Sequence, residues 1–169
     1  MKTLIVLSAV AGAGKSTWAE QYRKTHHHVH VVSSDEIRKE LTGKYSDLSH
    51  DKEMWRIYFD RIREYAAKDQ DVTVIADSTN ILNKYRLLYK DVIGFDKKVL
   101  VIIRKDLPVI LKQNKERNEA KIIPEEAIKW MYENFEEPTE EVLSIFDEYD
   151  QVQSWFDSSK VKDSFHYKD

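Results

Sequence analysis

Residues 8–18 read SAVAGAGKSTW and directly follow the apolar run of residues 4–7. The pattern G-x-x-x-x-G-K-[ST], which describes a phosphate-binding loop, fits this stretch through residues 14–16. Its first glycine is replaced by Ala9. A phosphate loop requires an apolar strand before it and a helix after it, and both patterns are present. The stretch therefore predicts a strand, a phosphate loop and a helix, in that order.

Small residues in this loop let backbone N–H groups turn toward phosphate oxygens, and the following helix adds the positive end of its dipole. Lys15 supplies a point charge for phosphates, and the Ser16 hydroxyl is a ligand for Mg²⁺. The expected phosphate contacts are Gly12, Ala13, Gly14, Lys15, Ser16 and Thr17. An ordinary Gly-containing turn is the disfavoured alternative. Ala9 adds one methyl group, which has little effect if its φ is below zero.

The composition is that of a globular protein. Hydrophobic residues make up 41% of the 169 residues and charged residues 34%. No apolar run approaches the roughly 20 residues that span a bilayer, and no cysteine is present to form disulfides or bind metal. We therefore expect one domain over residues 1–169, a cytoplasmic location and no membrane partner.

The charge balance limits the kind of ligand. The net charge is −3, whereas proteins that wrap long nucleic acids usually carry a basic surplus. A small anionic ligand, or a short grip on one end of a polynucleotide, is therefore favoured. The histidines of residues 26–30 lack an orderly ligand spacing, so a solvated connection is favoured over a metal site.

Strand and helix patterns alternate along the chain. We expect strands at 3–7, 29–32, 72–76 and 99–103, and a fifth strand or packed tail at 152–156. We expect helices at 15–24, 35–41, 52–67, 83–93, 106–117 and 124–137, and a short turn from Thr139. This alternation predicts an α/β fold with a parallel sheet of four or five strands, helices on both faces and a helical lid over residues 106–124.

Asp35 and Arg38 follow the second strand and share one face of the next helix. The carboxyl ends of parallel strands collect ligands. There, a carboxylate can accept the proton of an attacking hydroxyl, and an arginine can hold an anionic acceptor. A helix cap and a surface charge would explain the pair equally well.

Asp77 ends the third strand, where an acidic residue can reach Mg²⁺ directly or through water. Thr79 and Asn80 follow it and could position the acceptor or the nucleotide. The alternative for Asp77 is a common turn residue.

Arg117 and Lys121 are four residues apart on a predicted helix. Such a pair could close over a triphosphate and stabilise charge that develops during transfer. Taken alone, it would be interpreted as a solvated helix face.

Together, G-x-G-K-S-T, D-x-x-R, D-x-T-N and R-N-x-x-basic before I-P-E-E resemble the polynucleotide 5′-hydroxyl kinases of bacteriophage and bacterial end-repair enzymes. The likeness covers about residues 1–150 and includes MYENFEEPTEE at 131–141. It implies transfer of the γ-phosphoryl group of ATP to a 5′-hydroxyl of DNA or RNA.

The resemblance also implies residue roles. These are Lys15 and Ser16 for phosphate and Mg²⁺, Asp35 as general base, Arg38 for the acceptor's phosphate, Arg117 in the lid, and Asp77 either in the magnesium shell or holding a neighbouring arginine. Lys121 stands where relatives often carry a second lid arginine, and it lacks the bidentate fork.

Two other functions remain open on the sequence. One is a small-molecule kinase acting on a nucleoside or another hydroxyl compound. The other is a nucleotide-binding module without transfer activity, which Ala9 and Lys121 favour. The aromatic residues Trp155, Phe156, Phe165 and Tyr167 are expected to pack on the fold rather than form an interface.

Overall fold

A five-stranded sheet forms the centre of the computed structural model, which describes residues 1–155 and residue 157. The strand order is β2-β3-β1-β4-β5, and every neighbouring pair is parallel. The strands are β1 (Lys2–Ser8), β2 (Val29–Ser33), β3 (Val72–Asp77), β4 (Lys97–Ile103) and β5 (Glu148–Val152). The predicted α/β fold with a parallel sheet is confirmed.

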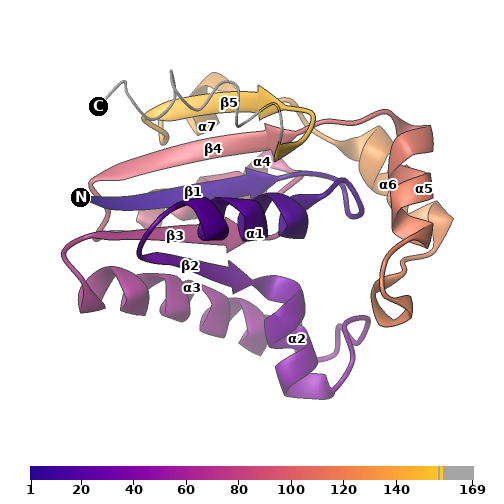
Figure 1. Ribbon diagram of the computed structural model, residues 1–169, viewed down its shortest axis with the longest axis horizontal. Coiled ribbons are helices and arrows are strands. Elements are labelled where there is room, and N and C mark those ends of the chain that lie inside the picture. Colours follow the sequence, from indigo (N-terminus) through magenta and orange to yellow (C-terminus); the bar gives the residue numbers. More distant parts are fainter. Residues whose placement is uncertain (156, 158–169) are drawn as a thin grey trace.

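Helices connect the strands and cover the sheet (Figure 1). They are α1 (Lys15–Thr25), α2 (Ser34–Thr42), α3 (Asp51–Lys68), α4 (Asn83–Arg86), α5 (Leu107–Lys115), α6 (Glu125–Asn134) and α7 (Glu140–Leu143), with 3₁₀ helices η1 (Leu87–Asp91) and η2 (Glu119–Lys121). Within the described residues, none of them is long and apolar enough to cross a membrane.

Two hydrophobic clusters lie on opposite faces of the sheet, because successive side chains of a strand point to opposite faces. In β1, Leu4 and Val6 belong to the cluster that includes α3, η1 and α7. Ile5 and Leu7 belong to the cluster that includes α1, α5 and α6. Burial on both faces explains why this strand is apolar throughout rather than alternating.

The parallel arrangement places the carboxyl ends of all strands along one edge of the sheet. In Figure 1 every arrowhead points to the side where α2, α5 and α6 lie. The turns after β1, β2 and β3 therefore meet there, and in the register Ser33 pairs with Asp77. This edge positions the candidate site.

The helix predicted over residues 83–93 was wrong as a single element. The structure has α4 followed by η1. Arg86, Tyr89 and Val92 are all fully buried. A spacing of three residues brings them to one face because a 3₁₀ helix has three residues per turn.

Two other boundaries differ from the prediction. The fifth strand covers 148–152 rather than 152–156, and Phe156 lies outside the described residues. This edge strand buries only Val152 within its span, so its apolar signal is weak. Helix α6 ends at Asn134 instead of 137, and Phe135 leaves the helical conformation to pack against both hydrophobic clusters.

Aromatic stacking accounts for several residues that the sequence left open. Trp155 packs edge-on against Trp18, with ring centroids 5.6 Å apart, as expected for packing on the fold. Phe165 and Tyr167 lie outside the described residues. His26 stacks on Tyr22 at 3.8 Å, and His30 stacks on Tyr65 at 4.0 Å.

Replacing Ile62 in α3 with alanine tests this packing. Ile62 is fully buried, so Ile62→Ala should lower the free energy of unfolding by about 2–5 kcal/mol, measured by chemical denaturation. Glu64→Ala, on the exposed side of the same helix, should change it by less than about 0.5 kcal/mol. Equal effects of the two variants would contradict the packing described.

Candidate active site

The phosphate loop turns sharply at two glycines. Gly12 has φ 88° and Gly14 has φ 104°, in the left-handed region that favours glycine. A Cβ at Gly14 would also lie 3.1 Å from Lys105 Nζ. Ala9 is not among the described residues with positive φ, and its N–H donates to the Thr79 carbonyl at 2.8 Å. Alanine therefore fits position 9 without backbone strain.

Lys15, Ser16 and Asp77 meet where α1 begins beside the end of β3. The Ser16 hydroxyl donates to Asp77 Oδ2 at 3.3 Å. Burial raises the pKa of Asp77, and the charge of Lys15 only partly offsets it. Burial likewise lowers the pKa of Lys15 against the charge of Asp77. Both side chains are thus poorly solvated ions that a phosphate and a cation would stabilise.

The Ser16–Asp77 pair fits magnesium. Mg²⁺ is usually held by one or two protein oxygen ligands together with substrate phosphates and water. Ser16 and Asp77 provide a hydroxyl and a carboxylate at adjacent positions. Across residues 1–155 and 157, no group of three or more His, Cys, Asp or Glu side chains is arranged to hold a metal.

Asp35 and Arg38 share a helix face, as predicted. Arg38 Nη1 donates to Asp35 Oδ1 at 2.7 Å. Its other two nitrogens, Nε and Nη2, donate to the carboxylate of Asp51 at 2.8 and 3.0 Å. Burial opposes the charge on Arg38, but hydrogen bonds and charges from Asp51 and Asp35 raise its pKa overall. The guanidinium of Arg38 therefore fixes the side chain of Asp35, which lies in the first turn of α2.

The lid cations do not lie on one helix, which corrects the prediction. Helix α5 ends at Lys115, and Lys121 ends η2. The buried Asn114 side chain closes the loop between them through two hydrogen bonds with the backbone of Ile123, at 2.7 and 3.0 Å. Arg117 lies on this closed loop. The hydrogen bonds of the Asn114 side-chain amide hold the loop in place of the helix that the sequence predicted.

Lys121 reaches across to the region of α2. Its ammonium lies 3.2 Å from Glu36 Oε1 and 5.1 Å from the centre of the Tyr45 ring. Tyr45 in turn donates to Glu36 at 3.0 Å. Lys121 thus fastens the lid loop to the helix that carries Asp35.

Asp35 and Arg117 line two adjoining cavities. The larger one, about 370 Å³, follows the phosphate loop past Lys15 and Asp77. The smaller one, about 60 Å³, lies under the lid loop beside Tyr45. Arg117 Nη1 is buried without a hydrogen-bond partner among the described residues. Because Arg117 lines both cavities, its guanidinium is placed to bind an anionic group that bridges them.

Most of the predicted residues converge on these cavities. The larger cavity is lined by Gly12, Gly14, Lys15, Ser16, Thr17, Asp35, Asp77 and Arg117, and the smaller one by Asp35, Arg117 and Lys121. Ala13 is fully buried below the loop. Thr79 and Asn80 line neither cavity. Asn80 is buried, and its Nδ2 donates to the Leu7 carbonyl at 2.8 Å, so its amide joins strands rather than facing a ligand.

The larger cavity is also lined by Lys105, Gln113 and Trp155, none of which belongs to the motifs that predicted the site. Lys105 Nζ donates to Gln113 Oε1 at 3.1 Å. Burial lowers the pKa of Lys105, and no carboxylate in the described part of the chain forms an ion pair with it. Its position just after β4 was the available signal, by the strand-end rule that singled out Asp77.

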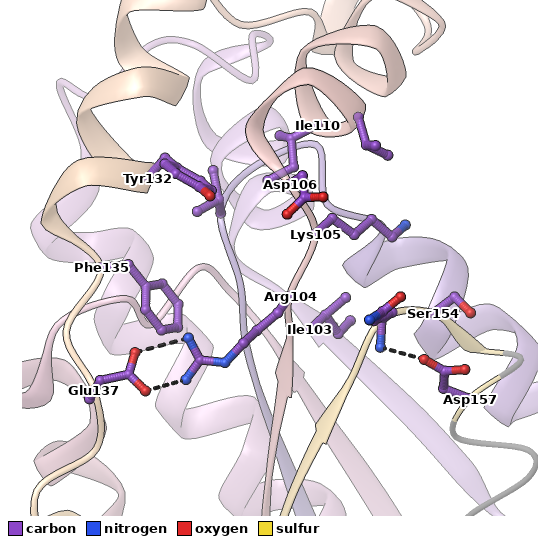
Figure 2. Close-up of a pocket in the computed structure, with 13 residues that line it drawn as sticks. Ile103, Arg104, Lys105, Asp106, Ile110, Tyr132, Phe135, Glu137, Ser154 and Asp157 are labelled. Carbon is purple, nitrogen blue, oxygen red and sulfur yellow. Dashed lines mark hydrogen bonds and ion pairs between the residues drawn. The ribbon is translucent and has the colours of Figure 1, made fainter.

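A further cavity, about 630 Å³, lies beyond Lys105 between α5, α6 and the end of β5. Figure 2 shows Arg104 directed toward Glu137 beside Phe135, while Lys105 extends the opposite way. Of these two neighbouring residues after β4, Arg104 is therefore directed toward Glu137 and Lys105 toward the phosphate-loop cavity.

Comparison with known protein families matches residues 4–138 to the AAA domain. The chain belongs to this family. An L-seryl-tRNA(Sec) kinase from Methanococcus maripaludis is 28% identical to this AAA domain over 147 residues, covering 80% of the chain and 53% of the relative. The chain thus spans about half the length of that curated relative.

Solved structures share the fold of this AAA domain. A chain of the Pnkp1/Rnl/Hen1 RNA repair complex aligns with a TM-score of 0.69 and 19% identity, covering 79% of this chain and 44% of that one. Kti12 from Chaetomium thermophilum with ADP-AlF3 also gives 0.69, at 14% identity and with 96% and 97% coverage. A gluconokinase from Sinorhizobium meliloti gives 0.58 at 18% identity, with 98% and 97% coverage. The P-loop kinase fold is common to them.

We expect Lys105→Met to weaken ATP binding about tenfold, the equivalent of one charge-assisted hydrogen bond of about 1.5 kcal/mol. Isothermal titration calorimetry measures the change in Kd. Lys112→Met, on the exposed side of α5, is the matched control and should leave Kd within about twofold. A Kd for Lys105→Met that equals the control's would remove Lys105 from the nucleotide site.

Asp77→Asn should stabilise the protein without ligand and weaken its response to magnesium. The folded-state pKa of Asp77 lies above its usual value, so its favourable contribution is present at low pH and lost as the pH rises through the folded pKa. At pH 7 the variant should therefore unfold at a higher temperature, and the difference should vanish below about pH 4.

The same variant should bind magnesium-ATP about 10- to 100-fold more weakly. Asp69→Asn, at an exposed position, should change neither quantity. A less stable Asp77→Asn at pH 7 would contradict the proposed charge burial.

Proposed function

We propose that the chain is an ATP-dependent kinase that transfers the γ-phosphoryl group to the 5′-hydroxyl end of DNA or RNA. One observation carries the proposal. Asp35 and Arg117 line both the cavity along the phosphate loop and the cavity under the lid, and Arg117 Nη1 is buried without a partner in the described structure. A base and an unpaired cation between two cavities suit transfer from a donor to an acceptor.

On the donor side, the phosphate loop and two lysines would bind ATP. The loop offers backbone N–H groups at the start of α1, and Lys15 and Lys105 line the same cavity. A magnesium ion held by Ser16 and Asp77 would neutralise charge on the phosphates.

On the acceptor side, Asp35 would accept the hydroxyl proton. Arg38 holds Asp35 Oδ1, and the carboxylate side chain remains 48% exposed, so Oδ2 can face the acceptor. The hydroxyl oxygen attacks the γ phosphorus, the bond from that phosphorus to the β–γ bridging oxygen breaks, and the proton passes to Asp35. Arg38 lines neither cavity, and its three guanidinium nitrogens bond to Asp35 and Asp51, so in this proposal it holds the base in place.

Arg117 would stabilise charge on the group in transfer. Arg117 lines both cavities. Protein donors that already point at the developing charge need no rearrangement during the reaction. Lys121, which is paired with Glu36, would fasten the lid over this point.

The size of the acceptor cavity supports a large acceptor that enters by its end. About 60 Å³ is far below the roughly 300–1,000 Å³ that enclose a whole small ligand. The net charge of −3 fits a short grip rather than a long nucleic-acid track. The likeness to a chain of an RNA repair complex supports the same class.

A second acceptor is favoured by the curated relative, the L-seryl-tRNA(Sec) kinase, at 28% identity. It would be the hydroxyl of an aminoacyl group at the end of a tRNA. The same residues would act, because that acceptor also presents a hydroxyl at the end of an RNA.

Asp35→Asn should lower phosphoryl transfer by about 10²–10⁴-fold, the usual effect of losing a general base, with ATP affinity within about threefold. Transfer is measured with γ-labelled ATP, Mg²⁺ and a 5′-hydroxyl oligonucleotide, and a 5′-phosphorylated oligonucleotide is the matched acceptor control.

Asp51→Asn is the matched protein control, because Asp51 holds Arg38 but lines neither cavity. It should cost less than about tenfold. If the two variants lost equal activity, Asp35 would only hold Arg38. Transfer to seryl-tRNA or to a nucleoside, with none to oligonucleotides, would replace the proposed acceptor.

A further inference from the structure

Arg86 is a buried cation that the proposed reaction does not use. Its side chain has no exposed surface. Each of its hydrogen bonds within the described residues goes to a hydroxyl, amide or carbonyl oxygen, and none goes to a carboxylate. Burial lowers its pKa to about 10, so it stays charged at neutral pH. The charges of Glu136 and Glu137 favour the guanidinium without offsetting the cost of its burial, and no carboxylate of the described residues is hydrogen-bonded to it.

Arg86 makes five hydrogen bonds through its three nitrogens; one goes to Asn83 Oδ1 in its own helix at 2.8 Å, and the other four join three segments around the site. Nε and Nη2 donate to Ser8 Oγ at 3.3 and 3.0 Å, where β1 enters the phosphate loop. Nε also donates to the Asn80 carbonyl at 2.9 Å, in the loop that follows Asp77. Nη1 donates to the Glu136 carbonyl at 2.6 Å, in the segment that follows α6.

Asn80 is held in an unusual conformation by this contact. Its φ is 45°, in the left-handed region that residues other than glycine rarely adopt. Its carbonyl accepts from both Arg86 and Ser8 Oγ, the latter at 2.7 Å, and Tyr89 donates to its side chain at 3.1 Å. These bonds fix the loop that directly follows Asp77.

Two backbone hydrogen bonds connect the same segments as Arg86. The Ala9 N–H donates to the Thr79 carbonyl at 2.8 Å, and the Glu136 N–H donates to the Ile81 carbonyl at 3.0 Å. The guanidinium also lies over the ring of Phe135, 5.0 Å from its centre. The entry of the phosphate loop, the loop after β3 and the segment after α6 are thus held together at Arg86.

We propose that Arg86 is a positioning residue that holds the entry of the phosphate loop, the loop after Asp77 and the segment after α6 as one rigid unit. The planar fork of arginine reaches all three at once, which the single ammonium of lysine cannot do. The inference rests on the proposed function only for its kinetic test.

Arg86→Lys keeps the charge and loses the fork. We expect amide hydrogen exchange at Ala9 and Glu136 to become at least about tenfold faster, because the two bonds beside Arg86 open locally. We also expect kcat to fall about 100-fold, the effect of a displacement of about 1 Å at a reacting group, with the Kd for ATP within about threefold.

Arg104→Lys is the matched control. Arg104 lies on the same Phe135 ring, at 5.1 Å from its centre, and pairs with Glu137 (Figure 2), but it contacts neither Ser8 nor Asn80. In the Arg104→Lys variant, the amide exchange rate at Ala9 and kcat should both stay within about twofold of the native values.

Ser8→Ala is the second variant, because it removes one oxygen that accepts from Arg86 and leaves the arginine in place. It should also speed exchange at Ala9 and lower kcat, and the Arg86→Lys/Ser8→Ala double variant should be non-additive. If Arg86→Lys does not fold, Ser8→Ala decides alone.

Native exchange at Ala9 and native kcat in the folded variants would overturn the inference, as would a kcat that falls only in proportion to the folded fraction. If the native protein transfers phosphate to no acceptor, the proposed function fails. The exchange rates at Ala9 and Glu136 then still test Arg86.

Discussion

The site depends on the hydrogen bonds that close the end of β1 onto the loop after β3. Ala9 N–H to the Thr79 carbonyl and Asn80 Nδ2 to the Leu7 carbonyl, both at 2.8 Å, bind two loops that are far apart in sequence. Because these bonds are buried, breaking one would leave an unpaired polar group, which is costly. The phosphate loop and Asp77 therefore keep a constant distance, which binding of a triphosphate and its metal requires.

Buried charges in this rigid part of the fold determine which ligands it can bind. Lys15 and Asp77 are both poorly solvated, and each lowers the cost of burying the other only in part. Arg117 keeps a buried nitrogen without a partner in the described chain. Such groups can bind a ligand of complementary charge without first losing water or a strong protein partner. The cost of ordering these side chains is met during folding rather than during the reaction.

Sequence reasoning found the parts of the site that depend on local patterns. The loop at 8–18 and the place of Asp77 could be predicted, because a strand that leads into small residues, or that ends in an acidic residue, is visible in one short stretch. The 3₁₀ geometry around Arg86 could not be predicted, since a spacing of three residues also suits an α-helix. Lys105 carried a comparable signal just after β4. The closed lid loop could not be predicted, because the hydrogen bonds of Asn114 with Ile123 join residues whose pairing no local pattern encodes.

The central claim is that the two cavities form one continuous path between donor and acceptor at Arg117. The affinity of a compound that joins adenosine to a second nucleoside through four or five phosphates tests this most directly. Occupying both cavities at once should make it bind at least about 100-fold more tightly than ATP, in competition with both ATP and the acceptor. An affinity equal to that of ATP, or binding that still admits the acceptor, would contradict the account.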